Sequence, residues 1–184
     1  MKMRERKTEE TMKIPEGIQL SVDSNFIIVK GEKGEIKRHI FDPKINIKVE
    51  NKMLKFVTRK MNKRSKAKIG TFKAHIKNMI KGTEKGHKYL LKVCSSHFPM
   101  KVTLSDNEIS VQNLFGEKVP RKINLRKNVS VKLEGEIITV EGIEKELVSQ
   151  TAADIENLTK RVNFDKRRFQ DGIFIIDKDG KEIK

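Results

Sequence analysis

The sequence predicts an α+β fold made of two tandem, structurally similar domains, each a small antiparallel or mixed sheet packed by a helix. An internal repeat is the first reason: residues 25–35 recur at 107–117, displaced by 82 positions (107 minus 25). The matching residues are Asn25, Ile27, Val29, Gly34 and Glu35 in the first copy and Asn107, Ile109, Val111, Gly116 and Glu117 in the second. A repeat at a fixed displacement indicates two copies of one supersecondary unit.

Period-two alternation of apolar residues is the second reason. It is carried by Ile18, Leu20 and Val22, and again by Ile45, Ile47 and Val49. Residues 47–56 and 131–140 each read as a strand, a tight turn and a second strand, at corresponding places of the two copies. Alternation of this kind is typical of antiparallel strands with one buried face, and the long apolar runs of buried parallel strands are absent.

Helical periodicity after each strand pair is the third reason. Apolar or small residues recur at spacings of three and four, which places them on one face of a helix that can cover a sheet. They are Ile69, Phe72, Ile76, Met79 and Ile80 after the first copy, and Val148, Thr151, Ala152, Ile155, Leu158 and Val162 after the second.

Turn residues divide the chain into these elements. Gly17 follows Pro15 and Glu16 in a turn, and Gly31 and Gly34 bracket a hairpin turn. Gly82 is expected to end the first helix as its C′ residue. The second copy is expected to begin with a strand at 87–93, to turn at Asp106 and Asn107, and to turn again at Asp171 and Gly172 before a last strand at 173–176. The expected boundaries are a charged tail at 1–11, a first domain at 12–82, a second domain with a C-terminal RNA-binding arm at 83–177, and a charged end at 178–184.

The charge balance predicts a polyanionic partner. Lys and Arg number 41 against 25 Asp and Glu, which gives a net charge of +16. This exceeds the magnitude of roughly 2–8 usual for a small soluble domain. Nucleic acid is the commonest partner of such a surface, and an anionic membrane surface is the main alternative.

Other features of the composition predict a soluble, intracellular protein that does not span a membrane. No uncharged apolar run reaches the length of a transmembrane helix, and the N-terminus has no apolar signal region. A single cysteine, Cys94, excludes an intramolecular disulfide and fits a reducing compartment.

Three basic clusters are candidate nucleic-acid contacts. The first is residues 59–68, with Lys73, Lys77 and Lys81 continuing along the expected helix; an ordinary solvated helix face is the alternative. The second is residues 160–172, in which Phe164 and Phe169 either stack on exposed bases or anchor a loop to the core. The third comprises Lys118, Arg121, Lys122, Arg126 and Lys127, for which exposed strand residues are the alternative.

Catalysis finds little support in the sequence, so no catalytic residue, metal or cofactor is expected. Cys94 and His97 are the only close Cys/His pair, and a structural zinc site needs a second pair. Cys94 is expected on a strand as a small apolar residue. Phosphate-loop and dinucleotide fingerprints are absent.

Several motifs in order along the chain resemble one family. They are Asn78-Met-Ile-Lys-Gly82, Gly86-His-Lys-Tyr89, His97-Phe-Pro99, Asn113-Leu-Phe-Gly-Glu-Lys118, Glu146-Leu-Val-Ser-Gln-Thr-Ala-Ala153 and Phe169-Gln-Asp-Gly-Ile-Phe174. The chain resembles the large-subunit ribosomal protein family numbered six in bacteria and nine in eukaryotes, in its eukaryotic and archaeal branch, with the eukaryotic side favoured. The resemblance runs from Met12 to about Asp177.

The resemblance implies two similar α+β domains and a structural, non-enzymatic constituent of the large ribosomal subunit. It implies binding to large-subunit rRNA near the sarcin–ricin loop and the stalk base, where the protein supports the site of the translational GTPases in cytosolic ribosomes. Its expected neighbours are other large-subunit and stalk-base proteins, and it is expected to act there as a monomer. A non-ribosomal RNA-binding or RNA-modifying protein is the alternative. The candidate rRNA-binding residues are Arg59, Lys60, Lys63, Arg64, Lys66, Lys68, Lys118, Arg121, Lys160, Arg161, Lys166, Arg167, Arg168 and Gln170.

Overall fold

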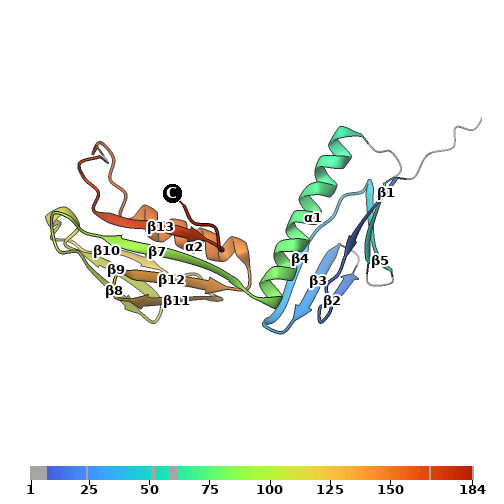
Figure 1. Cartoon of the computed structure of the whole chain (residues 1–184), viewed down its shortest axis with the longest axis horizontal. Helices are drawn as coiled ribbons and strands as arrows, with labels where there is room; N and C mark the ends of the chain where they lie inside the picture. Colours follow the sequence, from blue (N-terminus) through green and yellow to red (C-terminus); the bar gives the residue numbers. More distant parts are fainter. Residues whose placement is uncertain (1–7, 24, 51–52, 59–61, 166, 184) are drawn as a thin grey trace, which may run out of the picture. The chain divides into compact units, whose positions relative to one another are not determined.

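The computed structural model describes residues 8–23, 25–50, 53–58, 62–165 and 167–183 of the chain (Figure 1). The chain divides into two compact units, with the boundary between Lys85 and Gly86. Each unit combines antiparallel strands with one α-helix, so the predicted α+β class with two tandem domains is confirmed. The structure differs in one respect: each unit contains two small sheets where a single sheet was expected.

Unit 1 holds two three-stranded antiparallel sheets and one long helix. The sheet orders are β1-β6-β5 and β2-β3-β4. The elements are β1 (Thr8–Lys13), β2 (Gln19–Asp23), β3 (Phe26–Gly31), β4 (Gly34–His39), β5 (Ile45–Glu50), β6 (Met53–Thr58) and α1 (Lys63–Glu84). One core joins them, because Ile27 of β3, Phe56 of β6 and Ile76 of α1 are each fully buried in the same cluster. Burying one such side chain stabilises the fold by roughly 1.5–3 kcal/mol.

Unit 2 repeats this topology and adds to it. Its helices are α2 (Lys145–Leu158) and the short helix η1 (Leu114–Gly116). Its strands are β7 (His87–Cys94), β8 (Lys101–Ser105), β9 (Glu108–Gln112), β10 (Arg121–Asn124), β11 (Val129–Glu134), β12 (Ile137–Gly142) and β13 (Gly172–Lys178). The sheet β10-β9-β8 corresponds to β4-β3-β2. The sheet β11-β12-β7-β13 corresponds to β5-β6-β1 with β13 added beside β7. The internal repeat therefore reflects a repeated strand order, and β13 is the asymmetric addition.

The predicted turns lie at strand junctions. Gly31 and Gly34 face each other at the end of the β3–β4 hairpin, and Asp106 and Asn107 join β8 to β9. At Gly31 the hairpin approaches α1 so closely that an added Cβ atom would lie 2.7 Å from the carbonyl oxygen of Thr83. This close approach gives a physical reason for glycine at position 31.

Two predicted helix limits were wrong. The first helix does not end at Gly82: it continues to Glu84, because Thr83 is buried and its hydroxyl donates to the Met79 carbonyl 3.1 Å away. Gly86 takes the C′ position instead, with a φ of 79°. Val162 lies beyond the end of α2 at Leu158 and is 80% exposed, so it is not part of the apolar helix face.

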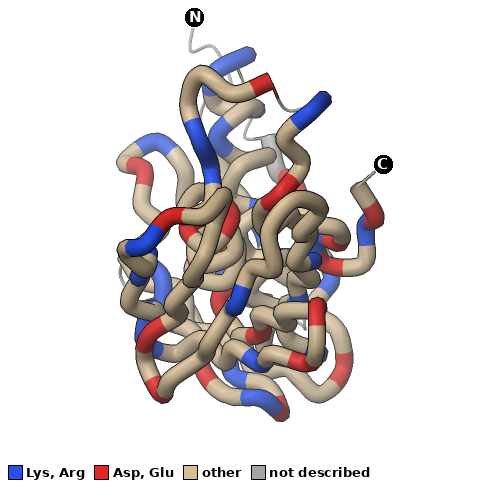
Figure 2. The backbone as a smooth tube through the Cα atoms, turned by 90° about the vertical axis from the view of Figure 1, so that its left-hand side faces the viewer, with Lys and Arg blue, Asp and Glu red and all other residues tan. Residues whose placement is uncertain are grey.

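Both ends of the chain contain more structure than the predicted charged segments. Thr8 to Thr11, expected within the tail, belong to β1 and pair with β6. At the other end, the Ile183 N–H donates to the Ile176 carbonyl at 2.9 Å, so the charged end folds back on β13. In Figure 2, Lys and Arg segments are interspersed with Asp and Glu segments along the described backbone.

Candidate nucleic-acid interface

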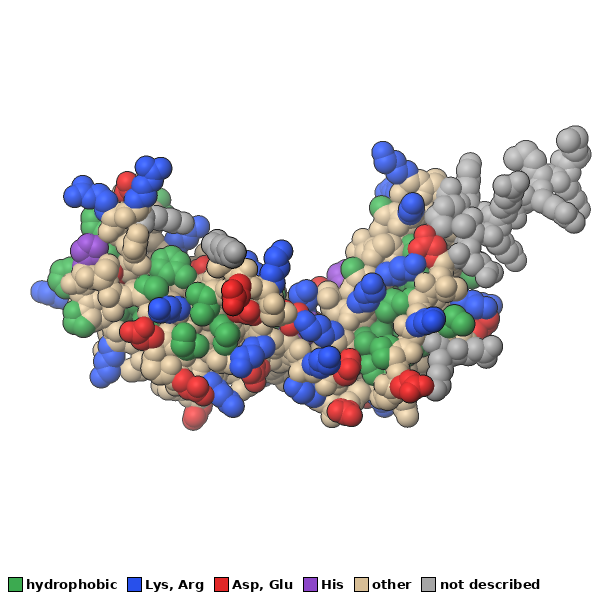
Figure 3. All heavy atoms as spheres, in the orientation of Figure 1, with side chains coloured by type: hydrophobic (Ala, Val, Ile, Leu, Met, Phe, Trp, Pro, Cys, Tyr) green, Lys and Arg blue, Asp and Glu red, His purple; other side chains and the backbone are tan. Residues whose placement is uncertain are grey.

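The loop between α2 and β13 in unit 2, residues 160–171, is called the arm here; it has no counterpart in unit 1. Asp165 holds its tip in a turn. One Asp165 side-chain oxygen accepts from the Arg167 N–H at 2.9 Å, and the Asp165 carbonyl accepts from the N–H groups of Arg168 at 3.1 Å and Phe169 at 2.9 Å. In Figure 3 basic side chains stand at the tip of the arm, at the upper left. These bonds fix the backbone of Arg167, Arg168 and Phe169 relative to Asp165.

A cluster of aromatic rings holds the base of the arm. Phe164 and Phe169 pack edge to face with centroids 4.9 Å apart, and Phe115 lies 5.8 Å and 5.9 Å from them. His97 adds a fourth ring, 5.7 Å from Phe169. Phe115 adopts a φ of 51° to reach the cluster, a backbone conformation that is rare for a bulky residue. Of the two roles considered for Phe164 and Phe169, this packing favours anchoring the loop.

Asp171 fastens the arm to the loop after β7. Its side chain is 2% exposed. It accepts from the Ser96 hydroxyl at 2.6 Å, from the His97 N–H at 3.2 Å and from the Ser96 N–H. Burial raises the pKa of Asp171, but the hydrogen bonds from Ser96 and His97 lower it by more, so the pKa lies below its ordinary value. The carboxylate therefore stays ionised and holds two loops together.

Ser96, His97 and Asp171 do not form a catalytic triad. The Ser96 hydroxyl lies 3.1 Å from the His97 Nδ1 atom, and the Asp171 carboxylate lies 3.3 Å from the same atom. A triad needs the serine on one ring nitrogen and the carboxylate on the other. This arrangement therefore serves to position the arm.

Arg121 and Glu117 brace the arm from the other side. The Arg121 guanidinium binds Glu117 through two hydrogen bonds, of 2.8 Å and 2.7 Å. It also donates to the carbonyls of Leu158 at 2.8 Å and Lys160 at 3.3 Å, where α2 ends. The hydrogen bonds from Arg121 hold the pKa of Glu117 below its ordinary value, against the opposing effect of burial. Arg121, a predicted rRNA contact, is thus engaged within unit 2.

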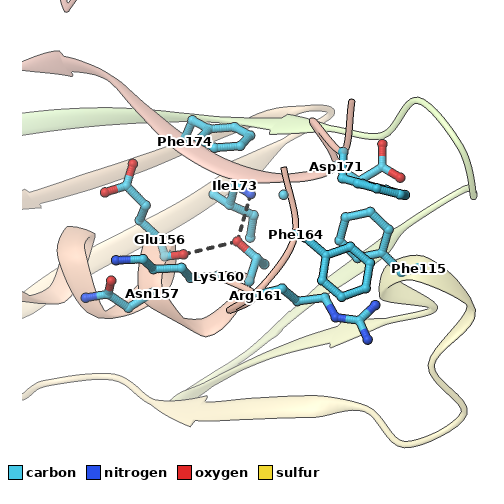
Figure 4. A pocket seen from close by; sticks show the side chains of 12 residues that line it. Phe115, Glu156, Asn157, Lys160, Arg161, Phe164, Asp171, Ile173 and Phe174 are labelled. Carbon is cyan, nitrogen blue, oxygen red and sulfur yellow. Dashed lines mark hydrogen bonds between the residues drawn. The ribbon is translucent and has the colours of Figure 1, made fainter. Parts of the chain in front are cut away.

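Arg161 is engaged in a similar way. Its guanidinium lies 4.1 Å from the centroid of the Phe164 ring and 5.2 Å from that of Phe115 (Figure 4). Its Nε atom is 3.8 Å from Glu117. Arg121 and Arg161 therefore support the arm. Other basic residues are better placed to bind a ligand.

Side chains of α2 and its end bind the outer edge of β13. The Ile173 N–H donates to the Thr159 hydroxyl at 2.9 Å (Figure 4). The Ile175 N–H donates to the Glu156 carboxylate at 3.1 Å. These bonds satisfy donors that an edge strand would otherwise expose. The hollow beside them has a volume of about 170 Å³, below the roughly 300–1,000 Å³ of small-molecule sites. The region is thus better suited to an extended partner than to a small substrate.

Four of the remaining predicted residues of unit 2 are exposed cations. Lys118, Lys160, Arg167 and Arg168 are exposed, and their side chains form no ion pair with any residue that the structure describes. Gln170 donates to the Arg167 carbonyl at 3.4 Å, and Lys166 lies outside the described residues. Lys118, Lys160, Arg167 and Arg168 are therefore exposed cations without an ion-pair partner among the described residues, which suits binding of phosphate groups.

In unit 1 the predicted basic segment is mostly helical. Asn62 caps α1 by accepting from the Ser65 N–H at 2.7 Å, so Lys63, Arg64, Lys66 and Lys68 lie in its first two turns. That first turn holds no acid, although a helix N-terminus favours negative charge. Arg59 and Lys60 lie outside the described residues.

Several other basic residues have partners within their own unit. Lys68 pairs with Asp42, and Lys73 pairs with Glu10 at 2.5 Å. In the third predicted cluster, Lys122 pairs with Glu108 at 3.0 Å and Arg126 with Asp154 at 2.8 Å. Lys122 lies on β10 and fits the alternative of an ordinary surface strand residue, whereas Arg126 lies in the loop between β10 and β11. Neither residue is a free phosphate-binding group, because each has an ion-pair partner.

The residues that position the arm, above all Asp171, Ser96 and Glu117, were not predicted as site residues. Asp171 and Glu117 lie within quoted motifs, and Ser96 lies beside one. The contact between Ser96 and Asp171 joins residues 75 positions apart, which no local pattern indicates. Cys94 ends β7 opposite Gly172, in the expected strand position. In the described part of the chain, no group of His, Cys, Asp or Glu has the arrangement of a metal site. No described helix is long and apolar enough to cross a membrane.

Comparison with known proteins identifies relatives of the whole chain. The family model "Ribosomal protein L6" matches twice, at residues 14–86 and 98–172. The "Large ribosomal subunit protein uL6" of Methanococcus vannielii is 41% identical over 174 residues, covering 95% of this chain and 96% of the relative. That of Methanothrix thermoacetophila is 40% identical over 167 residues, covering 90% and 94%. Both relatives are archaeal, and the favoured eukaryotic side of the branch stays a prediction.

Proposed function

The chain belongs to the ribosomal protein L6 family, and from this premise we propose that it is a constituent of the large ribosomal subunit that binds rRNA through the arm of unit 2. The family consists of structural, non-enzymatic proteins. This disfavours the alternative of an RNA-modifying enzyme. The two matched relatives are named as large-subunit proteins, which supports the same assignment here.

The arm is the observation that carries the proposal. Lys160, Arg167 and Arg168 are exposed on a loop whose backbone and base are fixed by the aromatic cluster and by Asp171. Because the loop is ordered before binding, little conformational entropy is lost when the cations meet phosphates. Arginine can also hold a phosphate through two parallel hydrogen bonds. Lys118, beside Glu117, extends the same basic surface.

Unit 1 contributes a second contact in this proposal. Lys63, Arg64 and Lys66 are exposed in the first turns of α1. The positive charges of these three residues repel one another and the positive N-terminal end of the helix dipole. Phosphate groups that approach relieve this repulsion. Arg59 and Lys60 precede them in the sequence and are assigned to the same contact.

The resemblance of the chain to its family supports a finer placement. In this proposal the protein lies near the sarcin–ricin loop and the stalk base of cytosolic ribosomes, as a single copy. There it contacts other large-subunit and stalk-base proteins and supports the site where translational GTPases act.

Salt dependence of rRNA binding tests the role of the arm. Each phosphate neutralised releases counterions, which adds about 0.9 to the slope of log affinity against log salt. The double variant Arg167→Gln/Arg168→Gln is expected to reduce the slope by about 1.8, the sum of two such contacts. Lys92→Gln/Lys132→Gln, which removes the same charge from exposed strand positions of unit 2, is the matched control. Equal slopes for the two double variants would contradict the assignment.

Footprinting tests the placement. Hydroxyl-radical cleavage of large subunits with and without the protein is expected to show protection at the sarcin–ricin loop and the stalk base. Protection confined to other rRNA segments would refute this placement and leave rRNA binding by the arm intact.

A further inference from the structure

Unit 1 carries an exposed row of aromatic rings, called the aromatic ladder here: Phe26, His39 and Phe41. Phe26 and His39 face each other across β3 and β4, with ring centroids 5.3 Å apart and planes at 74°. Phe41 continues the row, 6.5 Å from His39. The Lys37 ammonium lies 4.4 Å from the centroid of the Phe26 ring. The row thus combines three rings and a cation.

The ladder lies on the solvent side of its sheet. Ile27 and Val29, which alternate with Phe26 along β3, are fully buried in the core of unit 1. Phe26 is 37% exposed and Phe41 is 55% exposed. Burial in unit 1 therefore does not explain why large aromatic residues occupy these positions.

The ladder is continuous with the basic start of α1. Asp42, next to Phe41, pairs with Lys68 of the helix and accepts from the Lys44 N–H at 2.9 Å. The hydrogen bond from Lys68 holds the pKa of Asp42 below its ordinary value. Arg64 lies four residues before Lys68 and is exposed, about 6 Å away along the helix axis. Exposed rings and exposed cations therefore occupy adjoining parts of unit 1.

The acids near the ladder have their own interactions. Asp42 is neutralised by Lys68, and Glu35 pairs with Lys30 at 3.0 Å. Asp23, opposite Phe26 on β2, is also engaged in an interaction. Their charges are thus partly balanced, which lowers their repulsion of an approaching phosphate.

We propose that the aromatic ladder stacks an unpaired rRNA base, while the start of α1 holds the flanking phosphates. This inference rests on the proposed rRNA-binding function and assigns a second, chemically different contact to unit 1. Aromatic side chains beside cations are the combination that binds unpaired bases, because every base has a π face and each nucleotide carries a negative charge. A duplex offers no free base face, so the ladder discriminates single-stranded from double-stranded RNA.

The variant Phe41→Leu in the full chain tests the ladder. The probes are a single-stranded RNA carrying one 2-aminopurine and a fully paired duplex with the same number of phosphates. Affinity for the single strand is expected to fall about 5- to 140-fold, the range that loss of one base–aromatic stack produces. Quenching of 2-aminopurine is expected to weaken, and affinity for the duplex is expected to change less than twofold. Phe41→Tyr, which keeps a ring, is expected to restore single-strand binding.

Met53→Ala is the matched control, because Met53 is a 39% exposed apolar residue of the same unit. It is expected to leave both affinities unchanged. Unchanged single-strand binding by Phe41→Leu would overturn the inference, as would an equal loss for both RNAs. Unchanged binding of both RNAs with weakened association to large subunits would instead indicate a protein partner. The arm variant Arg167→Gln/Arg168→Gln separates the two proposals. If it weakens rRNA binding and Phe41→Leu does not, the arm proposal stands and the ladder proposal fails.

Discussion

Removal of the Asp171 carboxylate distinguishes two contributions to RNA binding, the fixed conformation of the arm and the positive charge of the protein. The substitution Asp171→Ala raises the net charge from +16 to +17 (16 plus 1), so charge alone predicts tighter binding of RNA. The structure predicts the reverse. Asp171 accepts from the Ser96 hydroxyl at 2.6 Å, from the His97 N–H at 3.2 Å and from the Ser96 N–H, and without these bonds the arm is freed.

The size of the effect follows from these three hydrogen bonds. A hydrogen bond to a charged group contributes about 1.5–3 kcal/mol. Ser96 and His97 are exposed, so water can accept hydrogen bonds from their donors when the Asp171 carboxylate is removed. This offsets part of the loss. We therefore expect the free energy of unfolding of unit 2 to fall by about 2–4 kcal/mol. We expect affinity for rRNA to fall about tenfold, since ordering the freed arm then opposes binding by roughly 1.4 kcal/mol.

The pH dependence has a defined sign. The pKa of Asp171 is lowered from 3.8 in the folded chain, so its stabilising contribution is present above pH 3.8. That contribution is lost as pH falls through the folded pKa. The difference in unfolding free energy between wild type and Asp171→Ala should therefore be constant from pH 7 to 5 and shrink below pH 3.8.

Thermal melting of each protein and fluorescence anisotropy with an rRNA fragment at fixed salt measure these quantities. Glu134→Ala, which removes an exposed acid from β11, gives the same net charge and serves as the control. Binding by Asp171→Ala as tight as that of Glu134→Ala, with unchanged melting of unit 2, would refute the reasoning.

Two further substitutions test close packing. Gly172→Ala forces an alanine into a φ of 155° and places its Cβ atom 3.3 Å from the Thr159 hydroxyl. The free energy of unfolding of unit 2 is therefore expected to fall by about 1–3 kcal/mol. A melting temperature equal to that of wild type would contradict this. Gly31→Ala places a Cβ atom 2.7 Å from the Thr83 carbonyl oxygen, and its overpacking is expected to destabilise unit 1 by about 1–3 kcal/mol. In calorimetry only the transition of unit 1 should move, and a shift confined to unit 2 would show that the contact is wrongly placed.

Much of the scaffold was predictable because its signals are local. The 82-residue displacement, the alternation at Ile45 to Val49 and the helical spacing at Ile69 to Ile80 each depend on neighbours in sequence. Helix ends were less predictable. Gly82 and Gly86 both fit a C′ position by sequence, and burial of Thr83 against the β3–β4 hairpin selects Gly86.

The sequence by itself determined the repeat, the α+β class, the positive charge and the position of the arm, because composition and periodicity are properties of the chain. Only the tertiary structure decided which cations stay free. Arg121, Arg161, Arg167 and Arg168 look alike in the sequence, yet the first two brace the arm through Glu117 and Phe164. The reason is physical: a hydrogen bond or a ring contact forms between segments that folding brings together, and no pattern along the chain specifies that distance.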